Sequence, residues 1–599
     1  MAVAWALTHF PNSERMAEYL NFFVWTPEHL SLRLSMYPGL NSILTAWLLQ
    51  FFKSAAVGVA LEAGLLALMT WLAAMVGKAW GRRSWAVVAL IPAVGMACLF
   101  LHKPSVTLEG IFFFGSLVAV GYASRQGKAW LTTVAIVVVG LLSFWFIAFP
   151  VTVLLMVTLT LLQLTLNSPP KLGGVPRSGE GVCKTFSILQ LFNSFLLPLL
   201  FIAITALSIK LASDHLGFIP FDKRWWYVPE VWDHVTELLL LLAAPIALMY
   251  VPVVGKTSVQ ALITVAASVT AGLFCYNKIT GNEGYQVSET VYRYAALAEA
   301  GEWQQLRDEV NSNESIDNNI YLQYALLAEA RLGTLPDNLF QYPINTPELF
   351  SPRLENSPAA SDFNRIFYRE LGFTDEAFHQ AFQYGMMASP SCGFCAGSLR
   401  HMAEYSVALG DKPLAEKYLW LLERTSNNGD FVAEQRQLLK EKFSPLARGS
   451  GHGPMGCVDS SVPLRGDYFV MASAFNTEMV QHVEADPDNK AALDYLLCGL
   501  LLTKRLEVFR IVLNEYADKY KDAPLPRAYA EAAAVLRLLN PAGLSPDLHY
   551  APEIDEQLKA FNKAHAAQDD ASFRGTFWYY YFYAQIPPQQ EWINQSQSS

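Results

Sequence analysis

The sequence predicts an all-α protein, a bundle of transmembrane helices followed by a soluble domain of α-helical repeats. Three observations predict this fold class. Long apolar stretches fill the chain up to about Asn277, and stretches of that length cross a bilayer as helices. A polar, charge-rich half follows. In that half, apolar residues recur at intervals of three and four, the period of an amphipathic helix.

Eight apolar stretches are candidate membrane-spanning helices, because a bilayer core needs about 20 mostly apolar helical residues. They predict a transmembrane domain over residues 54–276, preceded by an N-terminal segment, 1–53. The stretches are 54–77, 85–101, 108–124, 130–149, 151–168, 187–211, 234–254 and 258–276.

The loop charges orient this domain. The loops after the first, third, fifth and seventh helices carry nine basic residues and one acid, Glu180. The opposite set, counted with the N-terminal segment and the adjoining helix ends, carries seven basic and nine acidic residues. Basic residues concentrate on the cytoplasmic side. The N-terminal segment and everything after Asn277 are therefore expected outside the cytoplasm. Met1–Phe10 is apolar but too short to span, so we expect it to be the end of a longer first helix.

Charge also limits the partners of the soluble half. Residues 1–276 hold 16 basic and 11 acidic residues, whereas residues 277–599 hold 27 basic and 42 acidic residues. A nucleic-acid partner is disfavoured, because phosphate binding needs a basic face. We expect the bilayer and a protein as partners instead, and the sequence indicates no cofactor.

Glu62 is an acid well inside the first apolar stretch. Ionisable groups at membrane depth are costly and are often functional. The plainer interpretation is a glutamate that pairs with a neighbouring helix or with Lys53. Both interpretations remain open.

Two outer segments carry polar residues among aromatic ones. The first, 11–42, holds Glu14, Glu18 and Glu28, and the second, 214–233, holds Arg224 beside several tryptophans and tyrosines. An aromatic belt at the membrane interface explains the rings. The alternative is a site for a phosphate- or sugar-bearing lipid, with arginine on the phosphate and rings on the sugar.

An acid-bearing first outer segment, many helices and a C-terminal outer domain together resemble the layout of glycosyltransferases that use polyprenyl-phosphate sugars. The resemblance implies an acid in the first outer segment that serves as base or metal ligand, here Glu18 or Glu28. It also implies Arg224 on the phosphate. The paired acids that such enzymes usually carry there are absent.

The soluble half is predicted to consist of helix pairs punctuated by glycine and proline. The segments 291–310, 321–333, 399–425 and 486–516 resemble degenerate tetratricopeptide repeats. Such repeats stack to bury a shared core and leave a concave face for a protein or peptide. A loop rich in glycine, proline and serine, 446–465, separates a first lobe, 277–445, from a second, 466–599.

Cysteine and histidine patterns give no metal site. Cys392 and Cys395 form a single CxxC pair without a second pair or a thioredoxin-like strand pattern. Outside the cytoplasm this pair favours a structural disulfide or two buried thiols over redox catalysis. In the loop, His452 and Cys457 lack partners at metal-ligand spacing.

The whole chain resembles an uncharacterised family of bacterial polytopic inner-membrane proteins. The resemblance rests on YPGLNSILTAWLLQFF (37–52), the multi-span block and EKYLWLLERT (416–425). It implies a bacterial inner membrane, a periplasmic C-terminal region and one more N-terminal helix, but no established activity.

Two functions from different classes follow. The first is a membrane protein whose periplasmic repeats bind a protein partner or assist envelope assembly. The alternative is a glycosyltransferase that takes a lipid-linked sugar at the outer face of the membrane. The enzyme requires acids and a basic group to converge at the outer surface, whereas the scaffold requires only the repeats.

Overall fold

The computed structural model describes the chain at residues 1–35, 38–81, 86–126, 128–167, 203, 231–250, 257–315, 318–344, 347–353, 357–388, 394–442 and 475–584. These residues form helices and no strand, which confirms the predicted all-α class. They divide into two compact units. The N-terminal unit comprises Met1–Glu289 with Arg424–Asn427, and the C-terminal unit comprises Thr290–Glu423 with Asn428–Ser599.

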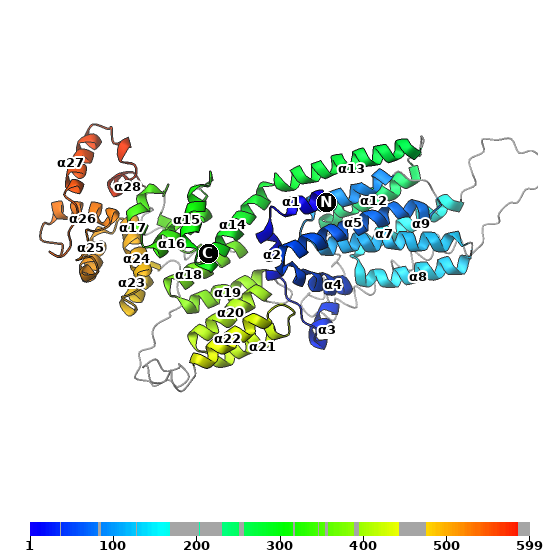
Figure 1. Cartoon of the computed structure of the whole chain (residues 1–599), viewed down its shortest axis with the longest axis horizontal. Coiled ribbons are helices and arrows are strands. Elements are labelled where there is room, and N and C mark those ends of the chain that lie inside the picture. The colour runs from blue at the N-terminus through cyan, green and yellow to red at the C-terminus, as the bar shows by residue number, and fades with distance from the viewer. Residues whose placement is uncertain are drawn as a thin grey trace, which may run out of the picture. The chain divides into compact units, whose positions relative to one another are not determined.

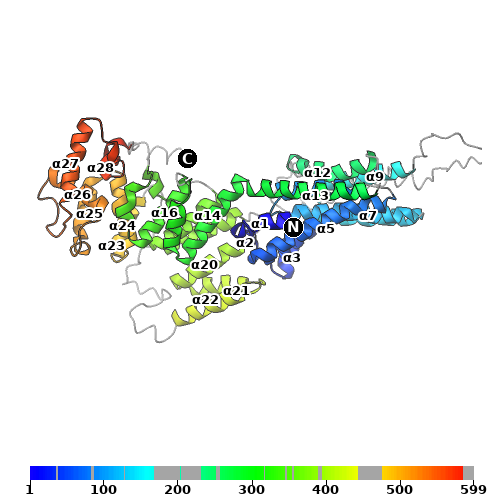
Figure 2. The ribbon, with the colours of Figure 1, turned by 45° about the horizontal axis from the view of Figure 1, so that its top comes forward.

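Six long helices of the N-terminal unit lie side by side with nearly parallel axes (Figures 1 and 2). They are α5 (Ala55–Ala79), α7 (Pro104–Arg125), α8 (Ala129–Phe146), α9 (Phe149–Asn167), α12 (Val231–Tyr250) and α13 (Thr257–Thr280), and the shorter η2 (Ala86–Ala89) and α6 (Leu90–Leu99) join α5 to α7. Seven of the eight predicted apolar stretches thus fold as helices. The stretch 187–211 lies outside the described residues.

Three of these helices are long and apolar enough to cross a membrane: Ala55–Ala79, Pro104–Arg125 and Ser258–Thr280. The apolar helical parts Val87–Leu99, Trp130–Ser143, Pro150–Gln163 and Val235–Ala247 are shorter. A membrane protein is consistent with these lengths and compositions. The full count of eight spans remains a prediction.

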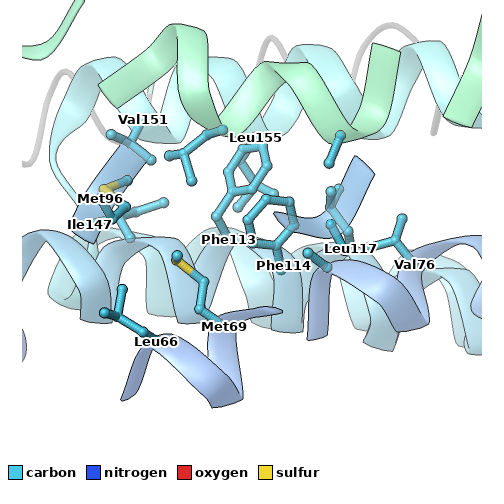
Figure 3. Packing of buried hydrophobic residues seen from close by; sticks show 14 of the residues in the cluster. Leu66, Met69, Val76, Met96, Phe113, Phe114, Leu117, Ile147, Val151 and Leu155 are labelled. Atoms are coloured by element: carbon cyan, nitrogen blue, oxygen red, sulfur yellow. The ribbon is translucent and has the colours of Figure 1, made fainter. Parts of the chain in front are cut away.

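The packing of α5 against α7 forms part of the core of the N-terminal unit (Figure 3). Leu66, Met69 and Val76 of α5 pack with Phe113, Phe114 and Leu117 of α7 in one buried cluster, to which α6 and α9 contribute. Directly after α5, the indole Nε1 of Trp80 donates to the carbonyl of Leu117 at 2.9 Å. A Cβ at Gly121 would lie 2.7 Å from that nitrogen, so glycine there permits the close approach of the two helices.

The N-terminal segment folds as short helices against the long ones. It forms α1 (Ala2–Leu7), α2 (Pro11–Tyr19), α3 (Pro27–Ser35), α4 (Gly39–Leu49) and η1 (Gln50–Lys53). The amide of Asn41 donates to the carbonyl of Ser105 at 3.0 Å, which ties α4 to the first turn of α7. The amide of Gln50 donates to the carbonyl of Phe23 at 2.7 Å. The described residues of the N-terminal segment therefore form a layer packed on α5 and α7.

The C-terminal unit is a succession of short helices, and its first helix, α14 (Glu283–Ala300), begins in the N-terminal unit. The predicted pairs 291–310, 399–425 and 486–516 each form two helices. Gly301 and Gly410, with φ of +72° and +79°, terminate the first helix of two pairs, because glycine adopts that conformation without strain.

The helices after α14 are α15 (Trp303–Asn311), α16 (Asn319–Leu332), α17 (Leu335–Asn338), η4 (Leu339–Gln341), η5 (Pro347–Phe350), α18 (Pro358–Leu371), α19 (Thr374–Ala388), α20 (Ala396–Leu409), α21 (Lys412–Glu423), α22 (Gly429–Lys442), α23 (Phe475–Ala485), α24 (Lys490–Leu502), α25 (Leu506–Glu515), η8 (Ala517–Lys519), α26 (Arg527–Leu539), α27 (Glu553–Ala566), η9 (Ala571–Phe573) and α28 (Phe577–Tyr583).

A buried charge network joins α14 to α18 and α20 inside the C-terminal unit. The guanidinium of Arg365, which is 2% exposed, pairs with Glu299 and with Asp362, the latter at 2.8 Å. It also donates to the hydroxyl of Tyr405 at 3.0 Å. Glu299 pairs with Arg369 as well. Each buried charge has an opposite partner, as burial requires.

Candidate functional site

Three side chains with metal-ligand atoms meet in the N-terminal unit. Glu14 comes from α2, Glu62 from α5, and His102 from the link between α6 and α7. The Nδ1 atom of His102 lies 3.5 Å from Oε1 of Glu14 and 3.7 Å from Oε2 of Glu62. The three ligand atoms all lie within 4.8 Å of one another. Two acids and an imidazole, 40 or more positions apart in the sequence, thus form one polar group.

Glu14 is positioned by the start of α2. Pro11 occupies the first turn, where its missing N–H does no harm. The carboxylate of Glu289, on α14, accepts hydrogen bonds from the backbone N–H groups of Asn12 at 3.0 Å and Ser13 at 2.8 Å. It also accepts from both side chains, at 2.7 and 2.8 Å. An acid at a helix N-terminus satisfies the unpaired amides and matches the helix dipole, so the turn that carries Glu14 is firmly held.

His102 and Glu62 are held to each other by the backbone. The helix α6 ends at Leu99, α7 begins at Pro104, and His102 adopts a φ of +60° in the turn between them. Its backbone N–H donates to Oε1 of Glu62 at 2.8 Å. Non-glycine residues with positive φ are uncommon and strained. The turn therefore maintains a costly conformation in which the imidazole also faces the two carboxylates.

Gly58 provides the room that Glu14 occupies. It lies one turn before Glu62 on α5, and a Cβ there would lie 2.8 Å from Oε2 of Glu14 and 2.8 Å from the ring of Phe52. Any larger residue would meet the carboxylate of Glu14. The close approach of α2 to α5 at this point depends on the missing side chain.

The group is buried and poorly satisfied. Glu14 is 0% exposed and Glu62 is 4% exposed. Both oxygens of Glu14, Oε2 of Glu62 and Nδ1 of His102 have no hydrogen-bond partner in the structure. Buried polar atoms usually have partners, and each exception requires an explanation.

Burial also alters the acidity of the two groups outside the helical spans. Burial, together with the nearby carboxylates of Glu62 and Glu289, raises the pKa of Glu14 to about 9. Burial lowers the pKa of His102 to about 4. At neutral pH the imidazole is therefore neutral, the form that can ligate a metal. Two acids and a neutral imidazole at these distances can hold a cation or share a proton.

Of the site residues predicted from the sequence, the structure places one in this group and others outside it. Glu62 belongs to the group. Glu18 is buried one turn beyond Glu14 on α2, whereas Glu28 is exposed at the start of α3. Arg224 lies outside the described residues, so its predicted role on a phosphate remains a prediction.

Glu14 and His102 are the members of the group that sequence reasoning did not select. Glu14 is one of several acids in a polar segment, and its spacing from Glu18 indicates only a shared helix face. His102 is a single histidine in a short link. One signal was available: it lies directly between two apolar stretches, at the end of the bundle where the first outer segment must pack.

The other predicted site residues are Cys392 and Cys395. Cys395 is buried, and its Sγ accepts the backbone N–H of Ser398 at 3.5 Å at the start of α20. Burial raises the pKa of this thiol, which makes it a poor nucleophile. Cys392 lies outside the described residues, so the disulfide remains a prediction.

Comparison with known proteins gives a family and no activity. The model of a family of unknown function matches residues 2–584 of the chain. No curated protein and no solved structure matches it.

Proposed function

The chain belongs to the family of unknown function DUF6057, and we propose that this member is a membrane-bound transferase that takes a lipid-linked sugar at the outer face of the membrane. One observation carries the proposal. A glutamate of the first outer segment, Glu14, is fully buried against Glu62 of a candidate span and against His102.

The position of Glu14 supports this function. A transferase of this kind requires an acidic residue, held in place, where the lipid headgroup enters. The layer α2–η1 packs on α5 and α7 and carries Glu14 into contact with a helix long enough to span the bilayer. A preorganised polar group in a site that excludes water stabilises developing charge more strongly than it could in bulk water. In this proposal Glu14 takes the role that the sequence assigned to Glu18 or Glu28.

The orientation is part of the proposal. The basic loops of the sequence favour a cytoplasmic location for the far ends of α5 and α7. The end with Glu14 is then periplasmic, as is the C-terminal unit, in a bacterial inner membrane. A lipid-linked sugar displayed on that side reaches the site laterally from the bilayer.

Release of the lipid phosphate tests this function. The full chain in lipid nanodiscs is incubated with polyprenyl-phosphate sugars extracted from bacterial membranes and with a bacterial envelope extract as the source of the sugar acceptor. Free polyprenyl phosphate is followed by mass spectrometry. We expect release by the native protein, its loss in Glu14→Gln, and its retention in Glu283→Gln, an exposed glutamate of α14. Equal release by Glu14→Gln and the native protein would refute the role of Glu14. Absence of release from every polyprenyl-phosphate sugar would refute the function.

A second function, the binding of a protein partner by the C-terminal unit, is favoured by a separate observation. Phe382 and Met386 lie one turn apart on α19 and are 48% and 45% exposed. Helical neighbours at this spacing form one apolar surface, and exposed apolar surfaces often mark interaction sites. The tetratricopeptide-like character of the helix pairs belongs to this second proposal.

Photocrosslinking in cells tests the second function. A photoreactive residue at position 382 should capture a discrete envelope protein, whereas the same residue at position 434, an exposed site on α22, should not. Identical capture from both positions would show that the surface of α19 has no special role.

A further inference from the structure

We propose that Glu14, Glu62 and His102 bind one divalent transition-metal ion, with Zn²⁺ as the preferred ion. The ligand atoms are one carboxylate oxygen from each acid and Nδ1 of the imidazole. This inference goes beyond the transferase function and does not depend on it, since binding is measured without a substrate.

The distances fit a zinc ion with little rearrangement. Tetrahedral Zn²⁺ with bonds of about 2.0–2.1 Å places its ligand atoms about 3.3–3.4 Å apart. Nδ1 of His102 already lies 3.5 and 3.7 Å from the two carboxylate oxygens. Three protein ligands leave a further coordination position open, which is the pattern of catalytic rather than structural zinc sites.

The unpartnered atoms show that the site is built rather than adventitious. Glu14 is 0% exposed, and neither of its oxygens has a hydrogen-bond partner. Oε2 of Glu62 and Nδ1 of His102 are likewise buried and unpartnered, and they face the same point. An ion bound there would satisfy one atom from each residue.

Charge balance points the same way. Across the described ranges of the chain, neither Glu14 nor Glu62 pairs with a lysine or an arginine. A third carboxylate, Glu289, lies nearby and is occupied by the amides of α2. Buried charges are normally paired or bound to metals, and a divalent cation would allow both acids to bind as carboxylates without a lysine or an arginine beside them.

The donor set selects the kind of ion. Carboxylates alone suit Mg²⁺ or Ca²⁺, whereas an imidazole favours zinc and its neighbours among the transition metals. The neighbours of the ligands hold them in orientation: Glu62 through the backbone N–H of His102, and Glu14 through the anchored first turn of α2. Such support is characteristic of metal sites.

Zinc titration tests the proposal directly. The full chain in nanodiscs is stripped with a chelator and titrated with ZnCl₂ by calorimetry, and bound metal is counted by mass spectrometry. We expect one zinc per chain, with affinity lowered about 100-fold or more in Glu14→Gln and His102→Ala. The matched controls Glu283→Gln and His9→Ala, both exposed residues of the N-terminal unit, should bind like the native protein. A native chain that binds no zinc would overturn the proposal, as would equal losses in the controls.

A cobalt variant identifies the ligand even if the loss variants fold poorly. Cobalt replaces zinc in tetrahedral sites, and a thiolate bound to it gives a sulfur-to-cobalt charge-transfer band in the near ultraviolet. His102→Cys loaded with Co²⁺ should show that band, and His9→Cys should not. Cobalt binding to His102→Cys without the charge-transfer band would show that residue 102 is not a ligand and that the ion binds elsewhere. Glu14 and Glu62 would then share a proton instead of an ion. Zinc binding without sugar transfer would remove only the transferase function, and transfer by a chain that binds no zinc would remove only the metal site.

Discussion

Replacing Gly58 by alanine should displace Glu14 while leaving every ligand in the sequence. The added Cβ would lie 2.8 Å from Oε2 of Glu14 and 2.8 Å from Phe52, whereas ordinary contact begins at 3.4 Å. Both neighbours must therefore move by about 0.6 Å, or α5 itself must shift. Because Glu14 is fully buried, its carboxylate cannot retreat into solvent.

Gly64 provides the matched control on the same helix. A Cβ at Gly64 meets nothing within 4 Å. Both substitutions lie inside α5, where alanine is favoured over glycine by about 1 kcal/mol, so this contribution cancels between them. Overpacking at Gly58 costs about 1–3 kcal/mol, and we expect Gly58→Ala to be less stable than Gly64→Ala by that amount.

The two variants are compared by thermal unfolding in nanodiscs and by zinc titration. Gly58→Ala should lose zinc affinity about tenfold or more, as supporting residues of metal sites do. Gly64→Ala should bind like the native chain. Zinc at 100 times its dissociation constant stabilises a folded protein by about 2.7 kcal/mol, so the native chain and Gly64→Ala should show a larger zinc-dependent rise in Tm. Equal zinc affinity in the two variants would refute the assigned packing of Glu14.

Three further predictions concern the rest of the fold. The neighbouring arginines and His401 lower the pKa of Glu299, although burial opposes this shift. Glu299→Gln should therefore destabilise α18 by about 3 kcal/mol at pH 7. Hydrogen exchange should show this loss shrinking progressively as pH falls below about 4.5, because protonation of Glu299 then removes the contribution from the native chain as well. Burial raises the pKa of Asp494 to about 6, so ionisation costs about 3 kcal/mol above that pH. Asp494→Asn should accordingly gain Tm relative to the native chain as pH rises from 4 to 6, and a constant difference would contradict this. Trp80→Phe should lower the free energy of unfolding by about 1 kcal/mol or more, because the hydrogen bond to the carbonyl of Leu117 is lost. Trp71 is 58% exposed, so Trp71→Phe should change Tm little.

The features that could be predicted from the sequence are those determined by neighbouring residues in the chain. Apolar length predicted the helices of the N-terminal unit, and glycines predicted the turns at Gly301 and Gly410, where φ is positive. Glu62 was selected because one charge among apolar residues is conspicuous. Each of these signals is contained in a stretch of about 20 residues.

The partners of Glu62 could not be predicted in this way. Glu14 and His102 reach it through the packing of α2 on α5 and through a strained turn, and neither packing nor strain has a signature in one sequence. The predicted boundary at Asn277 shows the same limit. Hydropathy falls there, whereas the N-terminal unit continues to Glu289, whose carboxylate binds the start of α2 by polar contacts that hydropathy does not register.

Because Glu289 caps α2, the drop in hydropathy near Asn277 is not a domain boundary at which the protein can be divided. A piece ending at Asn277 would leave the amides of Asn12 and Ser13, in the same turn as Glu14, without their acceptor. Residues 426 and 427 likewise complete the N-terminal unit: the hydroxyl of Ser426 donates to Gln50 at 2.8 Å, and Lys53 donates to the carbonyl of Asn427 at 2.6 Å. Recombination that exchanged either half alone would damage the other. The two halves are expected to be inherited together, in keeping with a family model that matches residues 2–584.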